Sequence, residues 1–140
     1  MARTLVDAGA VVALVNRTDR NHLQAVEWFR RFRGELLTTE AVITETAYVL
    51  AASAAHQRAA LVWFERARAA GLLRVEPVAD YEALARIMTQ YASLPCDYAD
   101  ASLIALAERT GITAIATIDQ RDFSVYRLQG RKRFHILLGN

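Results

Sequence analysis

The sequence predicts an α/β protein, a three-layer α/β/α sandwich with a central parallel sheet. Short apolar runs rich in β-branched residues alternate with longer amphipathic segments along the chain, which is typical of parallel strands joined by helices. The chain has 140 residues, of which 54% are hydrophobic and 23% charged. That composition suits a sizeable core in one domain spanning residues 1–140 and excludes a disordered or fibrous chain.

Five short apolar runs bounded by turn residues are predicted to be strands. They are Arg3–Val6, Glu35–Thr38, Leu72–Val75, Thr113–Thr117 and Phe134–Leu138. Between them, 3.6-residue periodicity and capping residues predict helices. These helices are Ala10–Asn16, His22–Arg33, a segment N-capped by Thr39 and running to about Ser53, His56–Ala70, Asp80–Tyr91 and Tyr98–Arg109. Within the second and fourth, the apolar faces are expected to include Leu23, Val26, Trp28 and Phe29, and Leu61, Trp63 and Phe64.

The charge and cysteine content narrow the class of protein. The formal charge is +2 and the pI is about 9.0, which permits a polyanionic partner without requiring one. Cys96 is the only cysteine, so no internal disulfide is possible. No secretory leader opens the sequence and no apolar run reaches the roughly 18 residues of a membrane span. We therefore expect a cytoplasmic protein with no membrane association.

Two aspartates follow predicted strands. Asp7 ends the first strand and Asp119 lies just past the Thr113–Thr117 strand. If these strands are neighbours, as in the usual doubly wound order, both carboxylates face one crevice at the carboxyl edge of the sheet. The alternative is that each is an ordinary turn-forming aspartate at a strand end.

Four further acids lie on predicted helices or at their N-caps. Glu45 shares a helix face with Val42 and Val49, and a carboxylate on an apolar stripe must be paired, protonated or metal-bound. Glu40, in the first turn of that helix, is explained by the helix dipole. Asp97 is expected to N-cap the helix in which Asp100 aligns with the apolar face, although both could be cap and dipole acids only.

A site of Asp7, Glu45, Asp100 and Asp119 would need a cation, because converging carboxylates repel one another. Carboxylate oxygens are the ligands that Mg²⁺ and Mn²⁺ prefer. His22, His56 and His135 are isolated and have no zinc-ligand spacing. The chain also lacks a P-loop and a Gly-x-Ser-x-Gly elbow. Such a site favours hydrolysis of a phosphodiester.

Four segments resemble the PIN domain, and together they cover nearly the whole chain. They are residues 5–14, 38–45, 97–101 and 116–123. The size of the chain and the Ala-Glu-Arg-Thr-Gly run that ends at Gly111 are similar to VapC toxins of bacterial toxin–antitoxin pairs. By this resemblance Asp7, Glu45, Asp100 and Asp119 are the catalytic, metal-binding acids.

The resemblance also assigns accessory roles and partners. Asp97 and Asp122 would be accessory acids and Thr117 a polar neighbour of the metal. Ala8 stands where the family often has Thr or Ser, which removes one hydroxyl contact. The implied activity is Mg²⁺- or Mn²⁺-dependent hydrolysis of structured RNA, such as a tRNA or rRNA loop, leaving 5′-phosphate and 3′-hydroxyl ends. A homodimer and a VapB-type antitoxin are the implied protein partners.

A basic run follows the fourth motif, consisting of Arg127, Arg131, Lys132 and Arg133. It could bind RNA phosphates, with Tyr126 or Phe123 stacking on an unpaired base, or it could be a solvated tail with Phe123 in the core.

Two other functions remain open. A phosphatase would want a second aspartate near Asp7 or a lysine after a late strand, and neither is present. A non-catalytic PIN-like module that binds RNA or protein is the main alternative.

Overall fold

The computed structural model describes residues 2–94, 96–128 and 131–138, and its centre is a parallel sheet. The strands are β1 (Ala2–Val6), β2 (Gly34–Thr39), β3 (Leu73–Glu76), β4 (Ala114–Ala116) and β5 (His135–Ile136). They lie in the order β3-β2-β1-β4-β5, and every neighbouring pair is parallel. The prediction of an α/β sandwich around a parallel sheet, with the first strand beside the 113–117 strand, is confirmed.

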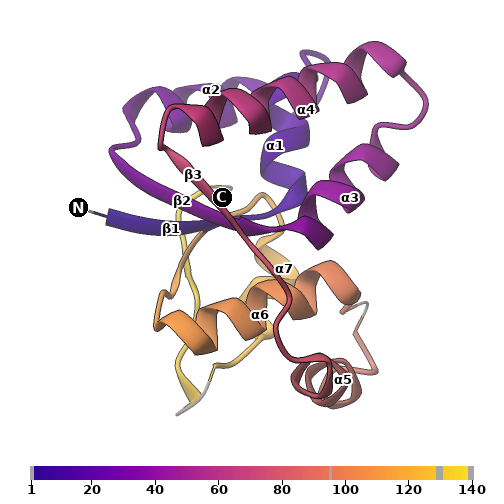
Figure 1. Cartoon of the computed structure of the whole chain (residues 1–140), viewed down its shortest axis with the longest axis vertical. Coiled ribbons are helices and arrows are strands. Elements are labelled where there is room, and N and C mark those ends of the chain that lie inside the picture. The colour runs from indigo at the N-terminus through magenta and orange to yellow at the C-terminus, as the bar shows by residue number, and fades with distance from the viewer. Residues whose placement is uncertain (1, 95, 129–130, 139–140) are drawn as a thin grey trace.

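Helices cover both faces of this sheet (Figure 1). They are α1 (Ala8–Val15), α2 (His22–Arg31), α3 (Glu40–Val49), α4 (Ala54–Ala69), α5 (Tyr81–Gln90), α6 (Tyr98–Thr110) and α7 (Gln120–Val125). In Figure 1, α1, α2 and α4 lie above the strands and α5 and α6 below them. Helix α3 stands at the end toward which β1 and β2 point, where it contacts α1, α4 and α6.

Two hydrophobic clusters form the core, one on each face of the sheet. Neighbouring strand residues alternate between them: Leu5 and Leu37 face the cluster with α5 and α6, whereas Val6 and Leu36 face the cluster with α1 and α4. Alternation is expected because successive side chains of a strand point to opposite faces. Burial on both faces explains why consecutive positions such as Leu5-Val6 and Leu36-Leu37 are both apolar.

Side-chain caps fix where the helices begin at the carboxyl edge. Asp7, Thr39 and Asp97 N-cap α1, α3 and α6, each accepting a hydrogen bond from a backbone N–H three residues on. Helix α6 ends at Gly111 in the left-handed conformation, which glycine adopts without strain. The expected caps at Thr39 and Asp97 are confirmed, while Asp7 starts α1 earlier than the predicted Ala10.

Some sequence expectations are wrong. Helix α3 ends at Val49 rather than near Ser53, because Ser53 instead N-caps α4. Leu23 and Leu61, expected on buried faces, are 82% and 48% exposed. The short helix α7 was not predicted. Among the described residues, none of the helices has the length and apolar character required to cross a bilayer.

Candidate active site

Asp7 lies where β1 ends, and its carboxylate is almost fully buried. Its Oδ1 accepts the Ala10 N–H (3.0 Å) and its Oδ2 accepts the hydroxyl of Thr117 (2.5 Å), the residue that follows β4. Burial is the main cause that raises the pKa of Asp7 to about 6, and the charge of Asp119 adds to it. The hydrogen bonds from Thr117 and Ala10 oppose this rise by stabilising the ionised form.

Asp119 reaches the same edge from β4. Because β4 is paired with β1, the two aspartates lie at the point where the strand order reverses, where open parallel sheets place their ligands. Asp119 N-caps α7 by accepting the Asp122 N–H (3.1 Å), and its own N–H donates to Thr117 Oγ1 (2.9 Å). Thr117 thus connects Asp7 to Asp119. Burial and the charge of Asp119 raise the pKa of Asp122.

A second acidic group comes from α3 and the start of α6. Glu45, Asp97 and Asp100 each offer a carboxylate oxygen, and these three atoms lie within 4.8 Å of one another. Asp97 Oδ1 accepts the Asp100 N–H (2.8 Å), so the cap of α6 also fixes the spacing of its two aspartates. Sequence reasoning treated Asp97 as accessory, but the geometry places its carboxylate within 4.8 Å of those of both Glu45 and Asp100.

The pKa values in this group are raised further. Burial first, then the hydrogen bond with Asp97 and the charges of Asp97, Asp100 and Asp7, raise the pKa of Glu45 to about 8. Burial and the charge of Asp97 raise the pKa of Asp100 to about 7, against the hydrogen bond from Tyr126, which lowers it. Asp7 and Asp119 also raise the pKa of Asp100. The two acidic groups therefore act on one another across a single site.

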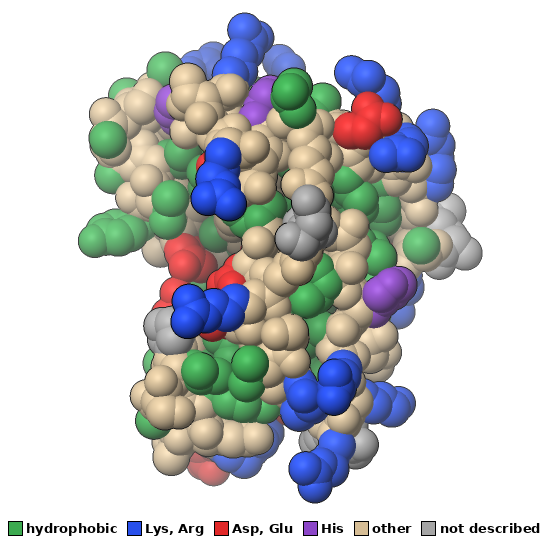
Figure 2. All heavy atoms as spheres, turned by 180° about the vertical axis from the view of Figure 1, so that it is seen from behind, with side chains coloured by type: hydrophobic (Ala, Val, Ile, Leu, Met, Phe, Trp, Pro, Cys, Tyr) green, Lys and Arg blue, Asp and Glu red, His purple; other side chains and the backbone are tan. Residues whose placement is uncertain are grey.

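One cleft of about 430 Å³ contains all of these acids. Its acidic lining residues are Asp7, Asp19, Glu45, Asp97, Asp100, Asp119 and Asp122. Figure 2 shows acidic side chains gathered in a hollow at mid-height on one side of the molecule. No Lys or Arg belongs to the lining in the described part of the chain. The four acids expected from the sequence therefore share one cleft, with Asp97 and Asp122 beside them.

The donor set suits a hard divalent cation. All candidate ligands are carboxylate oxygens, and burial first, then the charges of neighbouring acids, raise the pKa at three of them. Glu45, Asp97 and Asp100 form the tightest group and could hold a cation directly, with Asp7 and Asp119 across the cleft. Hard cations prefer such oxygen ligands and retain water for a substrate.

Two features of the cleft were missed by sequence reasoning. Asp19, in the loop between α1 and α2, lines the cleft and had no role assigned from the sequence. One of the two interpretations of the basic run had Tyr126 or Phe123 stacking on a base, but the Tyr126 ring is fully buried and its hydroxyl donates to Asp100 Oδ2 (2.9 Å). Phe123 is likewise buried, at 1% exposed. The stacking prediction is therefore wrong for both rings.

The environment of Glu45 also differs from the expected one. Val49, assigned to the same apolar stripe, is 56% exposed, whereas Val42 is buried. Glu45 thus lies at the border of the buried face of α3 and remains half-buried, open to the cleft. Glu40 is exposed in the first turn of α3, as its structural interpretation predicts.

The basic run is not part of this cleft. The Arg127 guanidinium donates to the carbonyl oxygens of Ser124, Val125 and Tyr126 (2.7, 2.8 and 3.0 Å), which fixes it on the end of α7. Arg131, Lys132 and Arg133 are exposed. Whether these residues bind RNA stays a prediction.

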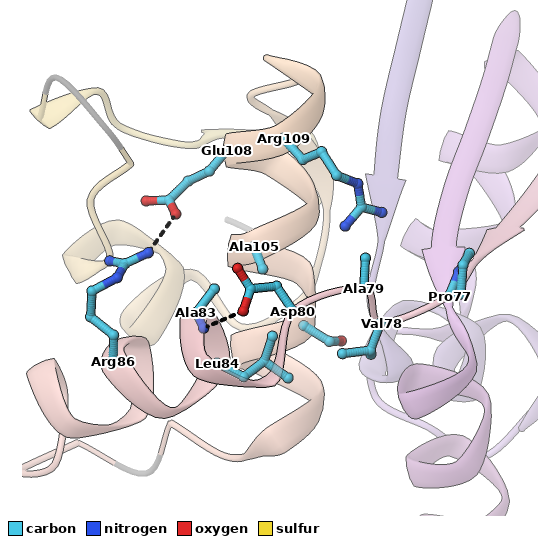
Figure 3. A pocket seen from close by; sticks show the side chains of 11 residues that line it. Pro77, Val78, Ala79, Asp80, Ala83, Leu84, Arg86, Ala105, Glu108 and Arg109 are labelled. Carbon is cyan, nitrogen blue, oxygen red and sulfur yellow. Dashed lines mark hydrogen bonds and ion pairs between the residues drawn. The ribbon is translucent and has the colours of Figure 1, made fainter.

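A second cavity, of about 280 Å³, lies between the segment after β3 and helices α5 and α6 (Figure 3). Three of its charged side chains have structural partners. Asp80 N-caps α5 through the Ala83 N–H (3.1 Å), and Arg86 forms an ion pair with Glu108 (3.4 Å). This cavity therefore shows no concentration of uncompensated charge like that of the acidic cleft.

Comparison with known proteins agrees with the fold. The PIN domain family matches residues 4–128. The chain is 29% identical over 133 residues to the Mycobacterium tuberculosis protein Ribonuclease VapC26, covering 95% of this chain and 98% of that protein. The crystal structure of Mycobacterium tuberculosis VapC20, described as a Sarcin-Ricin loop cleaving toxin, superposes with a TM-score of 0.68. That alignment has 22% identity and covers 86% of this chain and 92% of VapC20. The chain belongs to the PIN domain family.

Proposed function

We propose that this protein is a metal-dependent endoribonuclease that acts as the toxin of a toxin–antitoxin pair. The observation that carries the proposal is the convergence of acids from β1, α3, α6 and β4 in one cleft without a basic residue in its described lining. Membership of the PIN domain family and the similarity to a named ribonuclease along nearly the whole chain support it.

The cofactor we assign is Mg²⁺ or Mn²⁺. Bound in the cleft, such a cation supplies Lewis-acid charge to the phosphate and lowers the pKa of the attacking water. The residues of the chain hold the ligands in place: Thr117 and the Ala10 N–H fix Asp7, and Tyr126 fixes Asp100. The half-buried Glu45 carboxylate forms a hydrogen bond with Asp97 and is a further carboxylate ligand in the cleft. Water is the proposed nucleophile, and the products carry 5′-phosphate and 3′-hydroxyl ends.

The substrate we assign is structured RNA, such as a loop of tRNA or rRNA, in the cytoplasm. A VapB-type antitoxin would inhibit the enzyme, and a homodimer is the proposed assembly. Arg131, Lys132 and Arg133 are exposed and would contact RNA phosphates outside the cleft, since phosphate contacts dominate such affinity.

Cleavage of total cellular RNA by the purified protein tests this function, with the 5′ ends of the fragments sequenced. We expect a few discrete cuts that need Mg²⁺ or Mn²⁺ and that disappear with EDTA, with Asp7→Asn and with Asp100→Asn. Asp80→Asn is the matched control, because Asp80 is an exposed helix cap outside the cleft and asparagine caps equally well. Equal cutting by the site variants would refute the role of these acids, whereas RNA binding without any cutting would support the non-catalytic module.

A further inference from the structure

We propose that Tyr126 is a positioning residue of the acidic cleft, fixing the Asp100 carboxylate so that it is preorganised to bind a divalent cation. The inference rests on the proposed function, because it concerns the same metal site. Tyr126 lies at the C-terminal end of α7 and is completely buried. Its hydroxyl donates to Asp100 Oδ2 (2.9 Å), joining a residue near the end of the chain to the first turn of α6.

Among the described residues, Tyr126 is the one hydrogen-bond donor to the Asp100 carboxylate. The Asp100 backbone N–H donates to Asp97, but that bond fixes the main chain and leaves the Asp100 side chain free to rotate. The neighbouring charges of Asp97, Asp7 and Asp119 all disfavour the ionised form of Asp100, whereas the Tyr126 hydrogen bond favours it. A ligand carboxylate commonly requires an outer hydrogen bond of this kind to keep its orientation.

The ring of Tyr126 is itself held rigidly. It packs edge-on against Phe123 and Tyr91, with centroids 5.2 and 5.0 Å away at interplanar angles of 86° and 64°. Phe123 packs in turn against Phe134, at 5.4 Å. Such edge-to-face contacts favour one orientation of each ring. The position of the hydroxyl is therefore set by the core, and little motion remains to be lost when a cation binds.

The backbone beside Tyr126 is also anchored, by the other tyrosine of the cluster. Tyr91, the C-cap of α5, accepts the Arg127 N–H on its hydroxyl (2.7 Å). Tyr91 and Tyr126 thus have matching chemistry in one aromatic cluster, each ring buried and each hydroxyl bonded. Only the Tyr126 hydroxyl reaches an acid of the cleft, which makes Tyr91 an internal control.

The test compares Tyr126→Phe with Tyr91→Phe, each of which removes one hydroxyl and keeps the ring. Mn²⁺ affinity of the purified, RNA-free protein is measured by isothermal titration calorimetry, and thermal unfolding in EDTA reports the folding of each variant. We expect Tyr126→Phe to weaken Mn²⁺ binding about tenfold or more and Tyr91→Phe to change it less than about twofold. Saturating Mn²⁺ should restore most of the RNA cleavage rate of Tyr126→Phe.

Three results would overturn the proposal. Unchanged Mn²⁺ affinity in Tyr126→Phe would show that the hydroxyl only satisfies a buried polar group. Equal weakening by both variants would show that the aromatic cluster, rather than the bond to Asp100, determines the affinity. A wild-type chain that binds no Mn²⁺ and cleaves no RNA would refute the proposed function and the positioning role together. Wild-type binding and cleavage with an unaffected Tyr126→Phe refutes the positioning role alone.

Discussion

Replacing Asp7 by asparagine is expected to stabilise the metal-free protein at alkaline pH even though it abolishes RNA cleavage. The folded protein raises the pKa of Asp7 from 3.8 to about 6, chiefly because the carboxylate is buried. Between about pH 4 and pH 6, the Asp7 carboxyl is therefore protonated in the folded state but ionised in the unfolded state. The free energy of unfolding falls as the pH rises through this range. Above it, the ionised Asp7 lowers the free energy of unfolding by about 3 kcal/mol.

Asparagine removes this cost and retains part of the local structure. It caps a helix as well as aspartate does, so the Ala10 N–H keeps its acceptor. The Thr117 hydroxyl loses its bond to a charged acceptor, which costs about 1.5–2 kcal/mol. We therefore expect Asp7→Asn to gain about 1 kcal/mol at pH 8 and to lose a similar amount at pH 4, a swing of about 2 kcal/mol.

Urea denaturation in EDTA at pH 4, 6 and 8 measures this swing, with Asp80→Asn as the control that should stay within about 0.5 kcal/mol of wild type. Adding Mn²⁺ at pH 8 should stabilise wild type more than Asp7→Asn, because the ionised Asp7 carboxylate favours binding of a cation in the same cleft. If Asp7→Asn were destabilised equally at every pH, the pKa of Asp7 would be the same in the folded and unfolded states, and the rise caused by burial in the acidic cleft would be refuted.

Three further predictions follow from the same structure. Mn²⁺ binding should release protons, and its affinity should rise between about pH 6 and pH 8, because the three acids with raised pKa must ionise to bind. Calorimetry in buffers of different ionisation enthalpy measures the proton release. An affinity that does not depend on pH would contradict this prediction. Gly34→Ala should destabilise the fold by more than about 1 kcal/mol, because φ is +144° and a Cβ would collide with the Ala2 carbonyl; an unchanged urea midpoint would refute this. Replacing Arg131, Lys132 and Arg133 together by alanine should weaken RNA binding and reduce the salt dependence of its affinity, with a slope in log–log form smaller by up to about 2. An unchanged salt slope would exclude these residues from the RNA interface.

Local chemistry explains why much of the site could be predicted from the sequence. Asp7 and Asp119 follow strands directly, and parallel strands bring their carboxyl ends to one edge wherever the helices between them pack. Thr39 and Asp97 are helix caps, whose side chains bond only three residues away. The positions of these strand-end aspartates and helix caps depend on residues nearby in the sequence. Residue type and spacing are therefore enough to predict them.

The parts that sequence reasoning missed depend on contacts between distant elements. Helix α7 has six residues, too few for a helical period to stand out. Its packing turns Tyr126 inward to Asp100 rather than outward to RNA. The exposure of Val49 likewise depends on where α3 leaves the core. From residue type alone, Tyr126 and Val49 could each lie in the core or at the surface. Tertiary packing decides which position each residue takes.

The most direct test of the central claim is the anomalous diffraction of Mn²⁺ in crystals of the protein. The acidic cleft is expected to hold a Mn²⁺ peak within coordination distance of oxygens from Glu45, Asp97 and Asp100, and the peak should vanish in Asp100→Asn. Density at other residues, or none in the cleft at a Mn²⁺ concentration that supports RNA cleavage, would contradict the account.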